Sequence, residues 1–144
     1  MITEDEKQLL YLNYASLIAH KLENILQDDL ISVVVFGNAI WDEAEESSNI
    51  DILIVSEKFE AVSRSDVIDS IEDDLKVSEE YMDLKDNSLG TNIRPLLLTQ
   101  SEINNDPSLI QGVIPDGFII YDTDDFMENK FKQPRKKRKK RKQI

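Results

Sequence analysis

The stretch ISVVVFGNAIWDEAEESSNIDILIVS, residues 31–56, decides the fold of this chain. It contains two apolar runs, at 31–36 and 50–55, which are rich in β-branched residues and have the length of buried strands. The first run is followed by Gly37, where the backbone can come close to a phosphate group. Asp51 is the second residue of the second run, and its carboxylate is a ligand suited to a hard metal ion. The stretch therefore predicts two strands with a nucleotide site where they meet.

The order of these residues resembles the motif of the nucleotidyltransferase superfamily, which has a strand, Gly-Ser, a short segment, and Asp-hydrophobic-Asp on the next strand. Gly37 matches the glycine of the family, and Asp51 matches the second acid. Asn38 takes the place of the serine, and Asn49 takes the place of the first acid. The second glycine that usually follows in the family is absent. The resemblance implies the fold of a minimal nucleotidyltransferase with a degenerate active-site motif.

The family has a third acid on a later strand, and two alignments of this chain are open. In the first, the strand lies at 93–99, and Arg94 takes the place of the acid. The constellation of Asn49, Asp51 and Arg94 then carries a formal charge of zero, and Arg94 pairs with Asp51 or contacts the nucleotide. In the second, the segment YMDL forms a strand, and Asp83 joins Asp51 as a ligand of Mg²⁺.

The resemblance implies transfer of a nucleoside monophosphate from a nucleoside triphosphate (NTP) to an acceptor, with two Mg²⁺ ions on the attacking and leaving oxygens. Gly37, Asn38 and Arg94 would bind the nucleotide, and Asp51 and Asn49 would act in catalysis. Two hard cations repel each other and need several carboxylates, so the substituted motif predicts reduced or lost catalysis. The acceptor and the choice of NTP do not follow from the sequence. The alternative is a non-catalytic module that binds a protein partner, as antitoxins of this family bind helical toxins.

The other apolar patterns predict an α/β (α+β) domain, in which helices pack on a mixed sheet of about four strands. Thr3 and Glu6 have the spacing of a capping box in front of an amphipathic helix at 4–26. The further expected elements are a helical turn at 39–46, a helix from Ser63 or Ser65 to 78, short helices opened by Ser101 and Pro107, and a strand at 118–121. Pro95 indicates that the strand at 93–99 lies at an edge of the sheet or starts irregularly. The four acids of 39–46 form a solvent-facing surface, or one of them supplies a carboxylate to the site.

Charge is distributed unevenly along the 144 residues, whose net charge is −12. All 29 acids precede residue 130, and residues 135–142 are eight consecutive lysines and arginines. We therefore expect a nucleotidyltransferase-like domain at 1–129 and a disordered polybasic tail at 130–144. Residues 133–144 could bind nucleic acid through its phosphates without reading its sequence. The alternatives are a localisation signal, a patch that binds anionic membrane surfaces, a solubilising tail, and a tail that folds back on the acidic domain.

Several other classes of site and location are constrained by composition. The chain has no cysteine, which excludes disulfides and thiolate chemistry and suits a reducing compartment. It has no apolar run long enough to span a bilayer and no signal-peptide pattern at its start, so we expect a cytoplasmic protein. Neither a P-loop nor a Gly-x-Ser-x-Gly motif is present. The helix at 4–26 is apolar on more than one face, so a homodimer is a further expectation.

Overall fold

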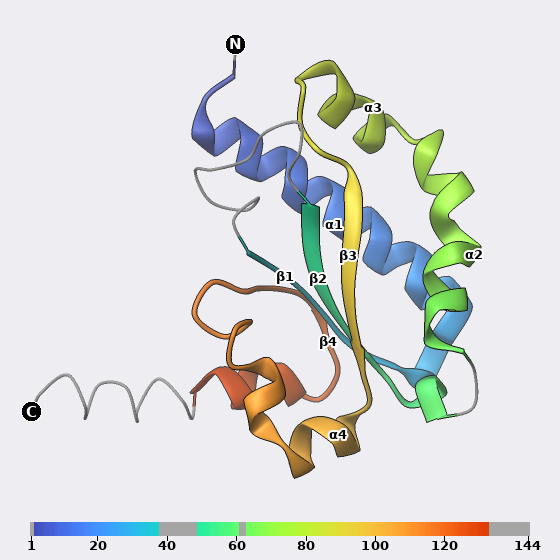
Figure 1. Cartoon of the computed structure of the whole chain (residues 1–144), viewed down its shortest axis with the longest axis vertical. Helices are drawn as coiled ribbons and strands as arrows, with labels where there is room; N and C mark the ends of the chain where they lie inside the picture. Colours follow the sequence, from blue (N-terminus) through green and yellow to red (C-terminus); the bar gives the residue numbers. More distant parts are fainter. Residues whose placement is uncertain (1, 38–48, 61–62, 133–144) are drawn as a thin grey trace, which may run out of the picture.

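The computed structural model describes residues 2–37, 49–60 and 63–132 (Figure 1). The helices are α1 (Glu4–Leu26), α2 (Arg64–Lys76), α3 (Glu79–Asp86) and α4 (Gln100–Asn105), with 3-10 turns η1 (Gln27–Asp29), η3 (Glu57–Glu60) and η4 (Pro107–Ile110). The strands are β1 (Leu30–Phe36), β2 (Asn49–Ser56), β3 (Asn92–Leu98) and β4 (Phe118–Asp122). Residues 126–132 form a further helical segment. The expected α+β architecture is confirmed.

The four strands form one mixed sheet in the order β3-β2-β1-β4. β1 pairs antiparallel with β2 and with β4, whereas β2 pairs parallel with β3. A parallel pair requires a crossover connection, and α2 and α3 make it. Pro95 lies on β3, which is an edge strand as its proline predicted.

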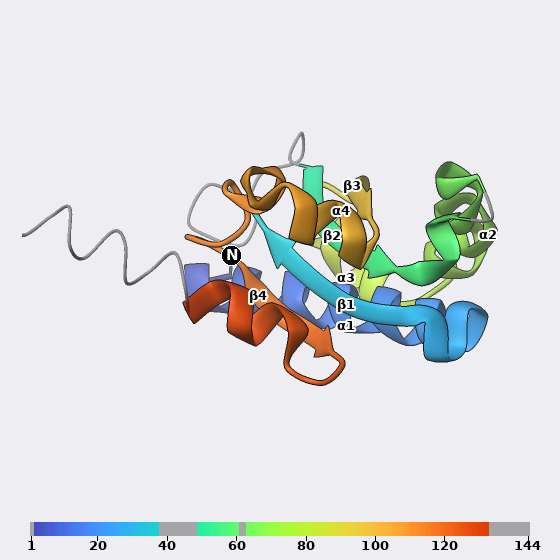
Figure 2. The ribbon, with the colours of Figure 1, turned by 90° about the horizontal axis from the view of Figure 1, so that it is seen from below.

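Helical elements cover both faces of the sheet, as Figures 1 and 2 show. One core cluster joins α1 and α2 to Ile50, Ile52 and Ile54 of β2. The other joins Leu53 and Val55 to α4, η4 and the segment 126–132. Because side chains alternate between the faces and both faces are covered, β1 and β2 are buried along most of their length. This is why both strands appear in the sequence as continuous apolar runs.

Three local expectations are corrected by the structure. The helix expected to run to residue 78 ends at Lys76, and Ser78 caps a separate helix, α3, by accepting a hydrogen bond from the amide of Tyr81. Asp83 therefore lies on a helix, and the strand expected around it is absent from this segment. The cap of α4 is Thr99, which forms a capping box with Glu102, and Ser101 lies inside the helix. The helical turn expected at 39–46 lies outside the described residues.

The described fold extends past the boundary expected at residue 129. The carboxylate of Asp122 accepts hydrogen bonds from the amides of Met127 and Glu128 and, at 2.6 Å, from the hydroxyl of Ser32. This cap fixes the segment against β1, and Phe131 is buried in the second core cluster, with 4% of its surface exposed. Residues 130–132 thus belong to the folded part, and 133–144 lie outside the described residues. No helix in the described ranges is both long and apolar enough to cross a membrane.

Candidate functional site

The end of β1 and the start of β2 bring Gly37 and Asp51 together. The two strands are antiparallel, and Phe36 lies opposite Asp51 in their register. Gly37 has a φ of +86°, and a Cβ atom at this position would overlap Oδ2 of Asp51. Only glycine allows both the backbone conformation and this close approach. The sequence motif Gly37…Asp51 therefore corresponds to one place in the structure.

Asp51 pairs with Arg94 across the parallel strands β2 and β3, where the two residues lie in register. Arg94 Nε donates to Oδ1 of Asp51 at 2.5 Å, and Nη2 donates to Oδ2 at 3.1 Å. Only 12% of the Asp51 side chain is exposed, against 67% of the Arg94 side chain. The hydrogen bonds to Asp51, and then its charge, raise the pKa of the Arg94 guanidinium. The pairing that the first alignment allowed is confirmed.

The first residue of β2 and the first residue of β3 are both asparagines. Asn49 lies two residues before Asp51, so strand alternation puts both on one face of the sheet. Asn92 lies opposite Asn49 in the register of β2 and β3, two residues before Arg94. Asn92 could not be predicted as a site residue from the sequence, because its partner on β2 is set by the crossover through α2 and α3. At neutral pH these four positions sum to no net charge.

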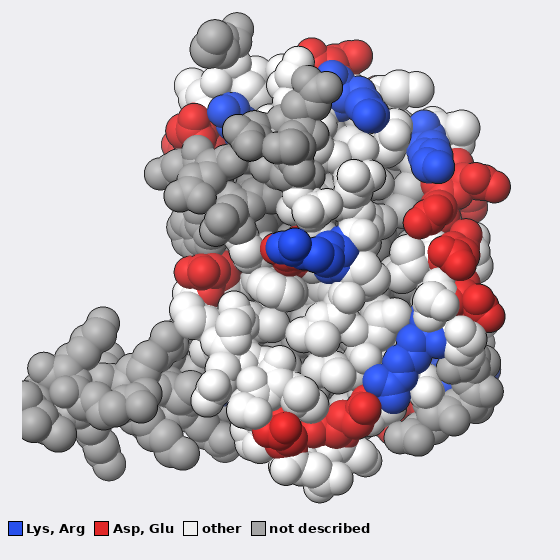
Figure 3. All heavy atoms as spheres, in the orientation of Figure 1, with Lys and Arg blue, Asp and Glu red and all other residues white. Residues whose placement is uncertain are grey.

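Charged side chains are unevenly distributed over the face of the molecule drawn in Figure 3. A small group of basic and acidic atoms lies side by side near the centre of this face, with uncharged surface below it. Asp and Glu instead gather along the edge formed by α2, whose sequence holds five acids. An anionic ligand would meet less repulsion at the neutral centre than over α2.

The other expected site residues do not join this group within the described structure. Asp83 is exposed on α3, and its backbone carbonyl accepts a hydrogen bond from Asn87. Asn38 and the four acids of 39–46 lie outside the described residues. Among the residues that the structure describes, no three His, Cys, Asp or Glu side chains are grouped so that they could hold a metal ion.

This donor set does not fit a pair of magnesium ions. Each carboxylate oxygen of Asp51 accepts a hydrogen bond from Arg94, so both potential metal ligands face a positive charge. The neutral amide of Asn49 stands where the family motif has an acid. Magnesium is bound through carboxylate oxygens in near-octahedral geometry, and a cation next to the guanidinium would be repelled.

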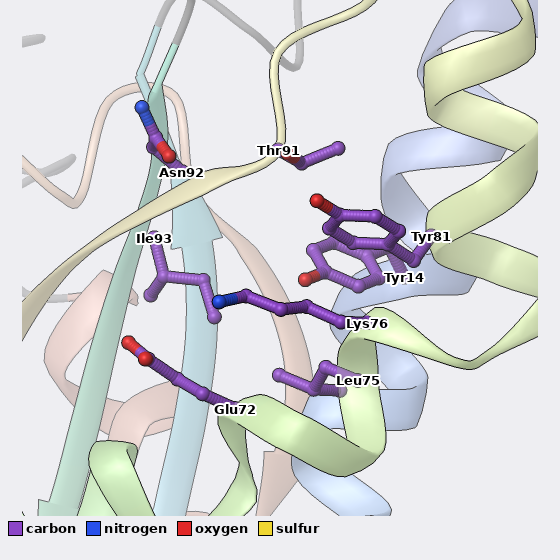
Figure 4. A pocket seen from close by; sticks show the side chains of 8 residues that line it. All are labelled: Tyr14, Glu72, Leu75, Lys76, Tyr81, Thr91, Asn92 and Ile93. Atoms are coloured by element: carbon purple, nitrogen blue, oxygen red, sulfur yellow. The ribbon is translucent and has the colours of Figure 1, made fainter.

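A hollow of about 150 Å³ lies at the start of β3, between this strand and the helices α1, α2 and α3 (Figure 4). Tyr14 and Lys76 point into it, and the rings of Tyr14 and Tyr81 lie 6.2 Å apart at 57°. Burial, together with the nearby Tyr81 and Glu72, raises the pKa of the Tyr14 phenol. Asn92 lines the hollow, so the hollow borders the same end of β3 as Arg94.

A protein of Methanocaldococcus jannaschii, described as "Putative protein adenylyltransferase MJ1305", is 30% identical to this chain over 129 residues. The match covers 87% of this chain and 80% of the relative. The chain belongs to the nucleotidyltransferase superfamily. No protein-family model matches this nucleotidyltransferase-like chain.

The fold is also similar to that of a toxin–antitoxin protein of known structure. A mutant of the toxin–antitoxin MntA–HepT matches with a TM-score of 0.51 at 14% identity, over 90% of this chain and 94% of that chain. A "putative nucleotidyltransferase" from Sulfolobus solfataricus matches with a TM-score of 0.48 at 16% identity, over 85% of this chain and 89% of that chain. At such identity the toxin–antitoxin match concerns the fold alone, and it agrees with a nucleotidyltransferase-like α+β domain.

Proposed function

We propose that this nucleotidyltransferase-family protein binds an NTP where β1 ends and β2 and β3 begin, and that it transfers the nucleotide slowly or not at all. The single observation that carries the proposal is the bidentate hydrogen bonding of the Arg94 guanidinium to the carboxylate of Asp51. In nucleotidyl transfer the carboxylates hold two metal ions on the reacting oxygens. An aspartate whose two oxygens are paired with arginine is poorly available for that role.

The nucleotide and the acceptor are proposed from the relative. The Methanocaldococcus jannaschii protein is described as a "putative protein adenylyltransferase", which favours ATP as the nucleotide and a protein as the acceptor. Gly37 is proposed to take part in nucleotide binding because it lies at the end of β1 beside Asp51, where the family motif has its glycine. Asn49 would contact the ligand as an amide and would not replace the missing carboxylate.

Calorimetric titration with ATP, together with an assay of pyrophosphate release in the presence of Mg²⁺ and a mixture of candidate protein acceptors, tests this proposal. We expect ATP binding and a release rate far below the ordinary enzyme range, which begins at about 1 per second. In the double variant Asn49→Asp/Arg94→Asp, which restores two acids, we expect Mg²⁺ to strengthen ATP binding. Wild-type release at about 1 per second or faster would refute the loss of catalysis. The absence of ATP binding, with and without Mg²⁺, would refute the nucleotide-binding function itself.

The second candidate is a non-catalytic module that binds a protein partner and, through residues 133–144, nucleic acid. The eight consecutive basic residues at 135–142 favour it, because a run of this charge attracts phosphate groups. The fold is similar to that of a toxin–antitoxin complex, which suggests that the partner is a protein with which this chain forms a complex. Affinity purification of the full chain, followed by identification of the proteins that co-purify with it in stoichiometric amount, is the direct test, and the absence of such a protein would refute the partner-binding function.

A further inference from the structure

The guanidinium of Arg94 uses only part of its hydrogen-bonding capacity on Asp51. A guanidinium has five N–H donors, and the structure directs one from Nε and one from Nη2 to the carboxylate. Two-thirds of the side chain is exposed, and the hydrogen bonds to Asp51 use neither N–H group of Nη1. Arginine binds phosphate oxygens through such pairs of parallel N–H groups.

Asp51 holds this guanidinium in one orientation. Its carboxylate lies between the backbone of Gly37, which leaves no space for a side chain, and the Nε–Nη2 edge of Arg94. The carboxylate is largely buried, so it cannot rotate freely into water. An arginine held on a rigid acceptor loses less side-chain entropy when it binds a ligand than a free arginine does.

We propose that Arg94 takes the place of a divalent cation, so that this site binds the phosphate groups of a nucleotide without metal. The inference rests on the proposed nucleotide-binding function and specifies its chemistry. A guanidinium and a metal ion both neutralise phosphate oxygens, but the guanidinium carries its charge permanently. Asp51 then acts as a positioning residue, and the neutral amides of Asn49 and Asn92 present N–H donors where carboxylates would repel the ligand.

A site in which Arg94 supplies the cation should bind ATP without Mg²⁺. In a site built from carboxylates, the metal links the protein to the phosphate groups, and a chelator abolishes binding. Here the protein already supplies the cation. Mg²⁺ bound to the phosphates of ATP would reduce their negative charge and weaken their attraction to Arg94, so chelation should preserve or strengthen binding.

The test is calorimetric titration of the full chain with ATP, ADP and AMP, in EDTA and in excess Mg²⁺, at about 0.15 M salt to screen long-range charge. We expect affinity in EDTA to rise with the number of phosphates and to be no weaker than in Mg²⁺. Arg94→Ala should weaken ATP binding in EDTA by about tenfold or more, the range of a hydrogen bond to a charged group. Arg94→Lys keeps the charge but not the paired donors and should recover part of the loss.

Lys58→Ala is the matched control, because it removes one exposed positive charge in η3, which follows the far end of β2. It should leave the affinity for ATP within about twofold, since an exposed charge at that distance is screened. The basic run at 135–142 is common to all variants, so its contribution cancels in the comparison. Circular dichroism of each variant reports whether the fold is retained.

The outcomes separate this inference from the proposed function. ATP binding in EDTA that depends on Arg94 supports both. Binding that appears only with Mg²⁺ overturns the inference and leaves the proposed nucleotide-binding function standing. Binding in EDTA that Arg94→Ala leaves unchanged also overturns the inference. No ATP binding under either condition overturns both. If Arg94→Ala does not fold, Arg94→Lys decides the question, because it keeps the charge but not the paired donors. An affinity for ATP in EDTA equal to that of the wild type would then overturn the inference.

Discussion

At the scale of single residues, position 37 accepts only glycine. Its φ is +86°, and the carboxylate of Asp51 fills the space where a Cβ would lie. Gly37→Ala should therefore lower the free energy of unfolding by about 1–3 kcal/mol, the cost of a strained backbone position plus a displaced neighbour. Urea denaturation of the purified variant measures this change.

Gly112→Ala is the control, because a Cβ at that position meets nothing within 4 Å. We expect it to leave stability nearly unchanged. The double variant Gly37→Ala/Asp51→Ala should recover part of the loss, since it removes the clash but leaves the positive φ. Equal effects of the two glycine substitutions would contradict the close approach of Gly37 to Asp51.

Tyr11 ties α1 to the loop that leads into β3. Its hydroxyl is buried and donates to the carbonyl of Gly90 at 2.9 Å. Burial raises the pKa of the Tyr11 phenol from 10.0 to about 12, and the hydrogen bond to Gly90 offsets part of the rise. Tyr11→Phe leaves that carbonyl without its donor and should cost about 1 kcal/mol at neutral pH.

The raised pKa of Tyr11 also predicts how stability changes in alkali. Below pH 10 the phenol keeps its proton in both the folded and the unfolded chain. Between pH 10 and about 12 the unfolded chain releases its proton first, so the stabilising contribution is lost as pH rises. Urea denaturation across this range should show a shallower decline for Tyr11→Phe than for the wild type. Tyr121→Phe, on β4, is the control, and an equal change in slope would contradict the assignment to Tyr11.

At the scale of elements, the start of α4 joins three parts of the fold through Glu102. Its carboxylate accepts from the amide of Thr99 at 2.9 Å and from Nη1 of Arg64 at 2.8 Å. The same Nη1 donates to the carbonyl of Leu97 on the edge strand β3, at 2.8 Å. The hydrogen bond from Thr99, and then Arg64, lower the pKa of Glu102. α2, β3 and α4 are thus linked at one point.

Glu102→Gln should change the acid limb of the stability profile. A lowered pKa contributes stability above the ordinary carboxyl value of 4.5, and this contribution is lost as pH falls through the folded pKa. Glutamine still completes a capping box but does not titrate, so the variant should show a weaker dependence on pH below 4.5. Glu6→Gln in the capping box of α1 is the matched control. Parallel acid profiles of wild type and Glu102→Gln would contradict this role.

The elements also show which features local sequence can predict. The bounds of α1, β1 and β2 follow from the sequence because a capping box opens α1 and continuous apolar runs make the strands. α3 was missed because only Leu84 of this short helix is buried, so an apolar stripe is lacking. The start of α4 was misplaced because Thr99 and Ser101 are both good caps, and the end of β3 decides between them.

The same contrast holds for the candidate site. Gly37 and Asp51 could be predicted because they flank consecutive strands, and the sequence between them is short. The contact of Arg94 with Asp51 spans 43 residues and depends on the register of a parallel pair that α2 and α3 set. Sequence allowed two alignments there, at Arg94 and at Asp83, and only the packed crossover distinguishes them.

At the scale of the whole molecule, the boundary of the folded part can be tested by truncation. Phe131 is buried in the second core cluster although it follows residue 129, where composition suggested that the domain ends. A chain that ends at 129 loses this ring and should be less stable by about 3 kcal/mol or more, the usual cost of deleting a core phenylalanine. A chain that ends at 132 should keep its stability. Equal stability of the two chains in urea would place the boundary at 129.

The uneven distribution of charge along the whole molecule predicts how it binds nucleic acid. The net charge of −12 includes eight positive charges at 135–142, so the rest of the chain is strongly acidic and should repel nucleic acid. Binding through the basic run would release counterions from the DNA. The logarithm of the affinity for duplex DNA should therefore fall linearly with the logarithm of salt concentration, with a slope no steeper than about −7. Residues 133–144 contain no aromatic side chain, so two unrelated sequences should bind equally.

Fluorescence anisotropy of labelled duplexes, from about 50 to about 200 mM salt, measures this slope. The matched control is a full-length chain in which the eight basic residues are replaced by glutamine, which keeps the length and removes the charge. Binding that survives this replacement would place the interface on the folded part. If the wild-type chain binds only weakly at low salt, while a peptide of residues 133–144 binds well, the acidic part of the chain competes for the basic run, because intramolecular contact has the higher effective concentration.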